Sequence, residues 1–228
     1  DELAPFDAQK KVIEYQMRTA TPLVDMSLRT FADTTASDAP APGGGSVAAY
    51  LGALGAALST MVANLSAHKR GWDARWAEFS AVAERGQRLK AQLLALVDED
   101  TAAFNEVMAA FGLPKGTDSE KQARTAAIQA ATRRAIEVPL RTMQLAAEIF
   151  PLAKAMVETG NPNSLTDAGV GALCARSAVY GAYFNVKINI TSLHDKAFAA
   201  ATAQEAEQIL AQAIQQESEI IALVSAKI

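Results

Sequence analysis

The feature that most constrains the fold of this chain is a long uncharged segment in its first third. Between Ala39 and Ala67 the sequence APAPGGGSVAAYLGALGAALSTMVANLSA contains no charged residue. A membrane-spanning helix needs about 20 apolar residues, so length alone permits a span. However, Ala, Gly, Ser and Thr gain little on transfer to hydrocarbon, and the segment starts with a Pro/Gly loop. It therefore predicts a helix buried in protein and not in a membrane, with Gly52 and Gly55 allowing close approach of neighbouring helices.

The rest of the chain shows helical spacing of its apolar residues, and no alternating run bounded by turn residues indicates a strand. We therefore predict an all-α protein, with a linker-like N-terminal arm over residues 1–20 and one domain over residues 21–228. That domain is expected to be a bundle of about six to seven helices, some of them long and kinked. The predicted helices are Asp7–Met17, Met26–Ala36, Ser46–Ala67, Trp72–Phe111, Asp118–Glu158, Thr166–Leu193 and Ala203–Lys227.

Several residues predict where these helices start, break or bend. Thr117 and Glu120 form the T-x-x-E pattern of a capping box, so a helix should start immediately after Thr117. Pro139 and Pro151 each lack the N–H that a helical turn requires, so they should kink or divide the fifth predicted helix. Gly86 is a candidate interruption of the fourth.

Composition argues against several classes of function. The net charge is −4 and the Lys and Arg residues are scattered, so the chain shows no basic surface for nucleic acid. A single cysteine, Cys174, excludes an internal disulfide framework and suits a reducing compartment. Two histidines leave little material for a metal site, and we predict none. No secretory signal is recognisable, so we expect a cytoplasmic protein.

Asp100 is the strongest candidate for a catalytic residue. Its segment, QLLALVDEDTAAFNEVMAAFG, predicts an apolar helical stripe in which position 100 is the only charged member. The stripe consists of Leu93, Val97, Asp100, Phe104, Val107 and Phe111. Asp98 and Glu99 fall off this stripe and should be solvated. Desolvation raises the pKa of a buried carboxyl towards values useful to a general acid or base, although a structural role for Asp100 is the alternative.

The glycines that precede the uncharged helix suggest a binding site. Gly43, Gly44 and Gly45 lack the G-K-[ST] ending of a phosphate-binding loop and follow no predicted strand, so a nucleotide site is poorly supported. What remains is a helix N-terminus with bare backbone, at which Ser46 is a possible N-cap. Such an end suits a carboxylate or a polar heterocycle. The alternative is a glycine-rich turn that packs tightly against another helix.

Polar residues near the ends of two other predicted helices are weaker candidates. Lys69 and Arg70 could bind anionic groups, but complementing the C-terminal dipole of their helix is the commoner role. Asn185 and Asn189 are four residues apart and share a helix face, so their amides could bind a heterocycle or form an interhelical hydrogen bond. His68 and His194 are expected at the surface or at helix ends.

Several separated motifs, in order, resemble the cyclodeaminase domain of the formiminotransferase-cyclodeaminase family. They are APAPGGGSVAAYLGALGAALSTMVANLS, LVDED, LPKGT, EVPL and GAYFNVKIN. The resemblance covers nearly the whole chain. The segment APFDAQKKVIEY is similar to the one that joins the two enzymes in bifunctional members, which implies a formiminotransferase domain as a possible partner.

The resemblance implies a homodimer, or a higher homo-oligomer, that binds a tetrahydrofolate derivative as substrate and holds no tightly bound cofactor. The implied reaction converts 5-formimidoyltetrahydrofolate to 5,10-methenyltetrahydrofolate and ammonia, a step of histidine degradation. Asp100 matches the acid/base aspartate of the family. The implied folate site comprises Gly43, Gly44, Gly45, Ser46, Lys69, Asp167, Asn185 and Asn189. Two alternatives remain: a methenyltetrahydrofolate cyclohydrolase, and a noncatalytic helical module for docking or dimerisation.

Overall fold

The structure of the protein is a computed structural model that describes residues 22–228. The arm predicted over residues 1–20 and the helix predicted at Asp7–Met17 lie outside the described residues. Residues 22–228 contain helices, turns and loops but no strand, so the fold is all-α, as the sequence predicts.

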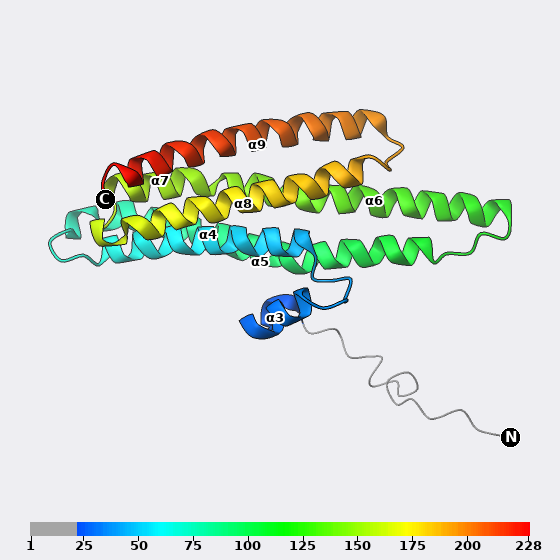
Figure 1. Cartoon of the computed structure of the whole chain (residues 1–228), viewed down its shortest axis with the longest axis horizontal. Coiled ribbons are helices and arrows are strands. Elements are labelled where there is room, and N and C mark those ends of the chain that lie inside the picture. Colours follow the sequence, from blue (N-terminus) through cyan, green and yellow to red (C-terminus); the bar gives the residue numbers. More distant parts are fainter. Residues whose placement is uncertain (1–21) are drawn as a thin grey trace, which may run out of the picture.

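Five long helices, one of them broken in two, form the bundle. In chain order the helices are α3 (Leu28–Thr35), α4 (Gly44–Ala67), α5 (Trp76–Phe111), α6 (Asp118–Ala147), α7 (Ile149–Thr159), α8 (Leu165–Ile190) and α9 (Lys196–Ser225), with short 3-10 helices at Leu23–Asp25, Asp73–Arg75 and Pro162–Ser164. Figure 1 shows the long helices lying side by side, with successive helices antiparallel and α7 continuing the direction of α6. Helix α3 lies outside the bundle, beside the start of α4.

The two prolines in the predicted fifth helix have different effects. The helix divides at Glu148, between α6 and α7. Pro151, in the first turn of α7, has no N–H for the carbonyl of Ala147, which explains a break at this point. Pro139 lies inside α6, and the helix continues through it. Gly86 does not interrupt α5 either. A Cβ atom there would lie 2.1 Å from Oγ1 of Thr60, so this glycine provides space for a side chain of α4.

Local capping signals predict some helix starts but not all. The capping box is confirmed: Thr117 Oγ1 accepts a hydrogen bond from the Glu120 N–H at 3.2 Å, and Glu120 accepts one from the Thr117 N–H at 2.8 Å. Helix α9 starts at Lys196 and not at the predicted Ala203. The reason is Asp195, whose side chain caps the helix by accepting from the Phe198 N–H at 3.0 Å.

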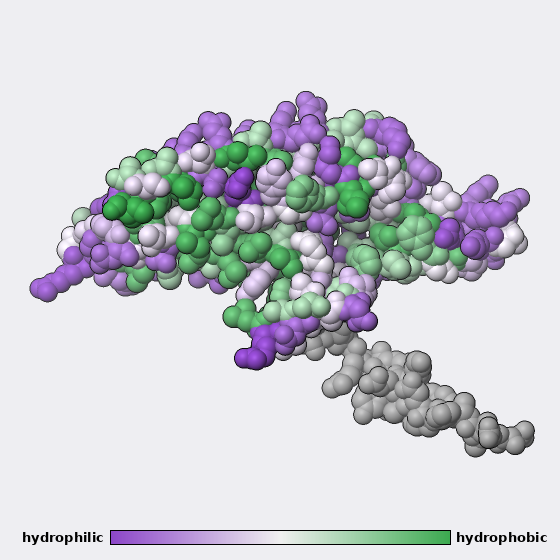
Figure 2. Space-filling view, in the orientation of Figure 1, coloured by the Kyte–Doolittle hydropathy of each residue, from purple (hydrophilic) through white to green (hydrophobic). Residues whose placement is uncertain are grey.

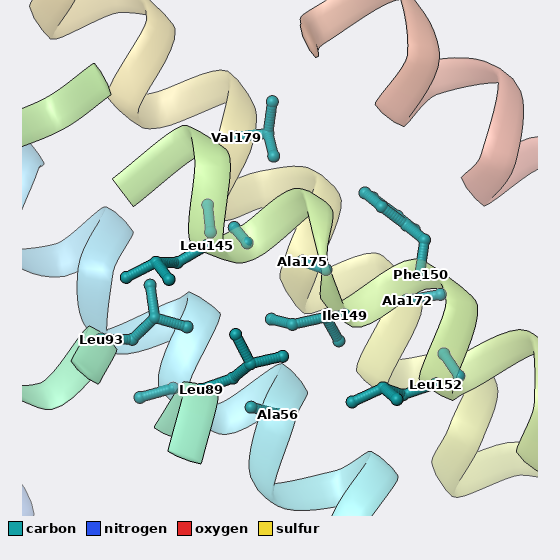
Figure 3. Packing of buried hydrophobic residues seen from close by; sticks show 14 of the residues in the cluster. Ala56, Leu89, Leu93, Leu145, Ile149, Phe150, Leu152, Ala172, Ala175 and Val179 are labelled. Carbon is teal, nitrogen blue, oxygen red and sulfur yellow. The ribbon is translucent and has the colours of Figure 1, made fainter. Parts of the chain in front are cut away.

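The core of the bundle combines alanine and glycine contacts on α4 and α8 with larger side chains from α5 to α7. The backbones of α4 and α8 approach so closely that a Cβ on Gly55 would lie 2.8 Å from the carbonyl oxygen of Gly171. Figure 3 shows Leu89 and Leu93 of α5 pointing towards Ile149 of α7 in the centre of this packing. Buried apolar area of this kind contributes about 25 cal/mol per Å² to folding.

Helix α4 is the one helix within residues 22–228 that is long and apolar enough to cross a membrane by length and composition alone. In the structure, 61% of its most apolar window is buried among the other helices. The packing of α4 therefore agrees with the prediction of a helix buried within protein. The core helix of a globular bundle is packed in the same way.

The predicted apolar stripe of α5 is buried only in its first part. Leu93 and Val97 are fully covered, whereas Phe104 is 37% and Phe111 51% exposed. The reason is that α4 begins beside Asp100, so the part of α5 beyond that level has no α4 to cover it. It pairs instead with α6 in a hairpin that extends past the rest of the bundle (Figure 1).

Helices α4 and α8 share an exposed apolar face. Its large side chains are Leu54, Met61 and Leu65 on α4 and Val170, Leu173, Phe184 and Ile188 on α8. Apolar residues gather along this part of the surface in Figure 2. Helix α4 carries no charge, and α8 has only Arg176 between Ala168 and Val186. Single exposed apolar residues are common on monomers, but a continuous strip indicates a covered surface.

We predict that this α4/α8 face is the contact between two copies of the chain. Replacing Leu54 or Leu173 with Arg should produce monomers, because a buried unpaired charge opposes association. Sedimentation at micromolar concentration measures the outcome. Ala91→Arg, on an exposed part of α5, is the control and should leave the dimer intact. A wild-type chain that sediments as a monomer would contradict the prediction.

Candidate active site

A cavity of about 250 Å³ opens where α4 begins, between α5, α6 and α8. Its lining residues are Pro40, Ala41, Gly43, Gly44, Gly45, Asp100, Thr101, Ala103, Phe104, Val107, Ala135, Asn185 and Asn189. Asp100 is the only charged residue among them. Within residues 22–228, no three side chains of His, Cys, Asp and Glu gather in a way that could hold a metal ion.

The carboxylate of Asp100 is held against the N-terminus of α4. The Ser46 hydroxyl lies 3.0 Å from both Asp100 Oδ2 and the Val97 carbonyl oxygen. Helix α4 starts at Gly44 with Gly43 as N-cap, so Ser46 is not the cap that the sequence suggested. Ser46 instead lies in the first turn of the helix, where its hydroxyl and the positive end of the helix dipole face the carboxylate from α5.

Burial raises the pKa of the Asp100 carboxyl above its ordinary value. The hydrogen bonds from the Ser46 side chain and backbone act in the opposite direction, because they stabilise the ionised form. Desolvation is the larger effect, so the net shift is upward. A half-buried carboxyl with a raised pKa, open to a cavity, is a candidate general acid or base.

Gly45 is the glycine that this arrangement requires. A Cβ atom on Gly45 would lie 2.1 Å from Asp100 Oδ1, whereas one on Gly44 would meet only Asn185 Nδ2 at 3.7 Å, and one on Gly43 nothing within 4 Å. The turn itself needs no left-handed backbone, since Gly71 is the only glycine with positive φ among the described residues. Bare backbone at Gly45 therefore admits the aspartate, while at Gly43 and Gly44 it faces the cavity.

Asn185 and Asn189 reach the same cavity from α8. Asn185 Nδ2 donates to the carbonyl of Gly181 at 2.9 Å, within its own helix. Asn189 Nδ2 donates to the carbonyl of Ala135 on α6 at 2.8 Å, so it forms the interhelical bond that the sequence left open. Both residues line the cavity as well, so the hydrogen bonds do not remove them from its wall.

Lys69 and Asp167 lie at the end of the bundle opposite to the cavity. Lys69 is two residues beyond the last residue of α4, a helix of 24 residues that is about 36 Å long. Its ammonium group lies 4.0 Å from the ring centre of Trp72. Asp167 is in the first turn of α8, whereas Asn185 and Asn189 are near its end. The structure thus does not bring these two residues to the cavity within one chain.

Asp98 differs from the solvated residue that the sequence predicts. It is half-buried, and its Oδ1 accepts a hydrogen bond from the Leu23 N–H at 2.5 Å. This bond ties the segment before α3 to α5. Glu99 is exposed, as predicted.

Sequence reasoning missed several residues of the cavity wall. The apolar stripe predicts that Phe104 and Val107 are buried, but α4 begins only at the level of Asp100, so they form an apolar wall beside Asp100. Ala135 on α6 carried no direct signal. An indirect one exists: Pro139, four residues later, lacks the N–H that would bond to the Ala135 carbonyl.

Comparison with known proteins gives the family of this fold and cavity. Residues 27–208 match the sequence profile described as formiminotransferase-cyclodeaminase. The chain belongs to the formiminotransferase-cyclodeaminase family. The match covers most of the all-α bundle and both sides of the cavity, so the family resemblance predicted from separated motifs is confirmed.

Similar proteins of this family carry two different names. Methenyltetrahydrofolate cyclohydrolase of Methylorubrum extorquens is 41% identical over 202 residues, covering 89% of this chain and 97% of that protein. Formimidoyltransferase-cyclodeaminase of Rattus norvegicus is 36% identical over 230 residues, covering all of this chain but 42% of the rat protein. The crystal structure of formiminotetrahydrofolate cyclodeaminase from Thermotoga maritima superposes with a TM-score of 0.78 at 27% identity, covering 89% of this chain and 97% of that one.

Gly45→Ala should destabilise the protein, because the added Cβ displaces the Asp100 carboxylate from the start of α4. The loss of its hydrogen bonds should lower the free energy of unfolding by about 1–3 kcal/mol. Urea unfolding measures this change. Gly44→Ala is the matched control, since its Cβ has room, and it should unfold like the wild type. Equal stability of the two variants would contradict this reading of Gly45.

Ser46→Ala should raise the pKa of Asp100 further, because it removes a hydrogen bond that stabilises the ionised carboxylate. The carboxyl-carbon NMR shift of Asp100, followed against pH, measures the titration directly. We expect the transition of the variant at higher pH than that of the wild type. Ser59→Ala, which removes another buried hydroxyl of α4, should leave it unchanged. A shift to lower pH in Ser46→Ala would reverse our assignment.

Proposed function

We propose that this chain is a formimidoyltetrahydrofolate cyclodeaminase, an ammonia-lyase that converts 5-formimidoyltetrahydrofolate to 5,10-methenyltetrahydrofolate. The observation that carries the proposal is the Asp100 carboxylate, with its raised pKa, at the wall of a cavity that contains no other charged side chain. This arrangement supplies one proton-transfer group and a place for a ligand beside it.

The proposed reaction needs two proton transfers at neighbouring atoms. N10 of the folate attacks the carbon of the formimidoyl group, which enters protonated as an amidinium, and the Asp100 carboxylate takes the proton from N10 as the new C–N bond forms. The protonated Asp100 then delivers this proton to the amine, which leaves as ammonia as its own bond to the carbon breaks. One carboxyl therefore serves as base and then as acid, and no net proton remains on the enzyme. Holding the two reacting nitrogens close together supplies much of the remaining acceleration.

The substrate is proposed to lie against the bare backbone of Gly43 and Gly44, with Phe104 beside it as an apolar wall. Asn185 and Asn189 would bind the pterin ring. Lys69 and Asp167 could contribute only from a second copy of the chain, because they lie at the far end of their own bundle.

A second candidate is methenyltetrahydrofolate cyclohydrolase, favoured by the relative of that name that is 41% identical and matches over 97% of its length. In that reaction water adds to the methenyl carbon, one C–N bond opens to give 10-formyltetrahydrofolate, and a proton is released. Asp100 would then act as the base that takes the proton from water. Both candidates use the same cavity and the same carboxylate.

The cellular setting is proposed from the relatives. The rat protein aligns with the whole of this chain, which supports a formiminotransferase domain as a partner and a role in histidine degradation. A cytoplasmic location fits folate one-carbon metabolism.

Incubation with each substrate separates the candidates. A cyclodeaminase forms free ammonia and the methenyl product, seen by its ultraviolet absorption, from 5-formimidoyltetrahydrofolate. A cyclohydrolase removes the absorption of added 5,10-methenyltetrahydrofolate faster than buffer alone. Absence of turnover with both substrates would favour the noncatalytic module instead.

Asp100→Asn should lower turnover by about 10²- to 10⁴-fold, as expected for loss of a positioned proton-transfer group. Because the folded-state pKa of Asp100 is raised, its protonated form stabilises the fold at low pH, and this contribution is lost as pH rises through that pKa. The neutral amide should therefore leave the melting temperature at neutral pH unchanged or higher. Glu99→Gln, at the exposed neighbouring position, is the control. Turnover of Asp100→Asn within a few fold of wild type would exclude the mechanism.

A further inference from the structure

Pro139 lies in the interior of α6 beside the cavity, and it leaves one backbone acceptor without its helical partner. Proline has no N–H, so the carbonyl of Ala135, one turn earlier, receives no bond from position 139. Asn189 of α8 fills this place, with Nδ2 donating to the Ala135 carbonyl at 2.8 Å. Both Ala135 and Asn189 line the cavity. The gap in the α6 hydrogen-bond ladder is thus occupied by a cavity side chain.

This bond fixes which way the Asn189 amide points. A carbonyl oxygen can only accept, so the amide must turn its NH₂ group towards Ala135 and its oxygen away. Asn185, one turn earlier on α8, is oriented in the same manner by the Gly181 carbonyl at 2.9 Å. Within the described residues neither amide oxygen accepts a protein hydrogen bond. Two acceptor oxygens of neighbouring cavity residues therefore remain available to a ligand.

We infer that Pro139 is a specificity-determining residue, which acts by holding Asn189 so that it and Asn185 present hydrogen-bond acceptors to a heterocycle with adjacent N–H donors. The inference rests on the proposed folate substrate, in which the 2-amino group and the neighbouring ring N–H of the pterin form such an edge. A ring with acceptors at those positions would face two amide oxygens, which cannot donate to it. The site therefore selects its ligand by the free lone pairs of the two amide oxygens as well as by the shape of the cavity.

A purely structural role for Pro139 predicts a different result when the proline is replaced. Pro139→Ala restores an N–H that competes with Asn189 for the Ala135 carbonyl. Because proline is the least favourable residue in a helix interior, the variant should be at least as stable as wild type. If Pro139 only shaped α6, ligand binding would be unaffected or improved. If it orients Asn189, binding weakens although the helix becomes more regular.

The test measures binding of 5-formyltetrahydrofolate, a folate probe that the proposed reaction does not consume, by calorimetry. We expect the Kd to rise about tenfold in Pro139→Ala and in Asn189→Ala, and no further in the double variant, because both changes remove the same oriented amide. With 5-formimidoyltetrahydrofolate, KM should rise while kcat stays within about threefold, since Asp100 is untouched. Pro151→Ala, at an exposed position in the first turn of α7, should bind like wild type.

A second probe examines the donor edge itself. An otherwise identical folate with a methyl group in place of the 2-amino group should bind wild type at least about tenfold more weakly, and this preference should shrink in Pro139→Ala and in Asn189→Ala. Undiminished preference and affinity in Pro139→Ala, with an active wild type, overturns the inference. If that variant loses its helical content, undiminished preference in Asn189→Ala overturns it instead. A wild type that neither binds nor converts any folate refutes the proposed function itself.

Discussion

The structure depends on one contact, the seating of the Asp100 carboxylate on the first turn of α4. A carboxylate leaves water only at a considerable cost, and here the Ser46 hydroxyl and the positive end of the helix dipole offset part of it. The contact requires Gly45, because any Cβ would occupy the place of the carboxylate. It also sets the level at which α4 begins, and therefore where the cavity opens beside α5. The glycine run is thus explained first by the aspartate and only then by space for a ligand.

Much of the fold follows from local sequence signals. The helical period predicts the long helices, and the capping box predicts the start of α6, because these signals act within one or two turns. Beyond Asp100 the apolar period of α5 wrongly predicts burial, and the reason is non-local. A stripe of apolar residues shows which side of a helix is covered, but not how far along the chain another helix will cover it. The start of α9 differs for a simpler reason: Asp195 caps this helix, and the helical period alone does not indicate a cap.

The same difference between local and non-local signals applies to the residues of the candidate site. Asp100, the three glycines and the two asparagines, which the sequence marks as candidates by their unusual residue types, all line one cavity, and their roles stay predictions. Lys69 and Asp167 also resembled family positions, yet they lie at the opposite end of the bundle. Neither the helical period nor the composition shows which helix ends lie next to each other in the bundle. Ala135 contributes its backbone carbonyl to the site. This carbonyl is available because Pro139 has no N–H to donate to it, and the Ala135 side chain gives no sign of this.

The two proposed activities differ in one reactant, water. A cyclodeaminase must keep water from the methenyl carbon that it has just formed, whereas a cyclohydrolase must admit it to the same carbon. Asp100 and Ser46 can serve either reaction, so the difference has to lie in the walls that control access. In a single chain Phe104 is 37% exposed beside the cavity, and Phe184 and Ile188 are more exposed still on the α4/α8 face, next in sequence to Asn185 and Asn189. A second copy on that face would cover apolar surface close to the asparagines and so restrict the entry of water. A contact between two copies on the α4/α8 face would thus link the oligomer to the choice of reaction through the same few side chains.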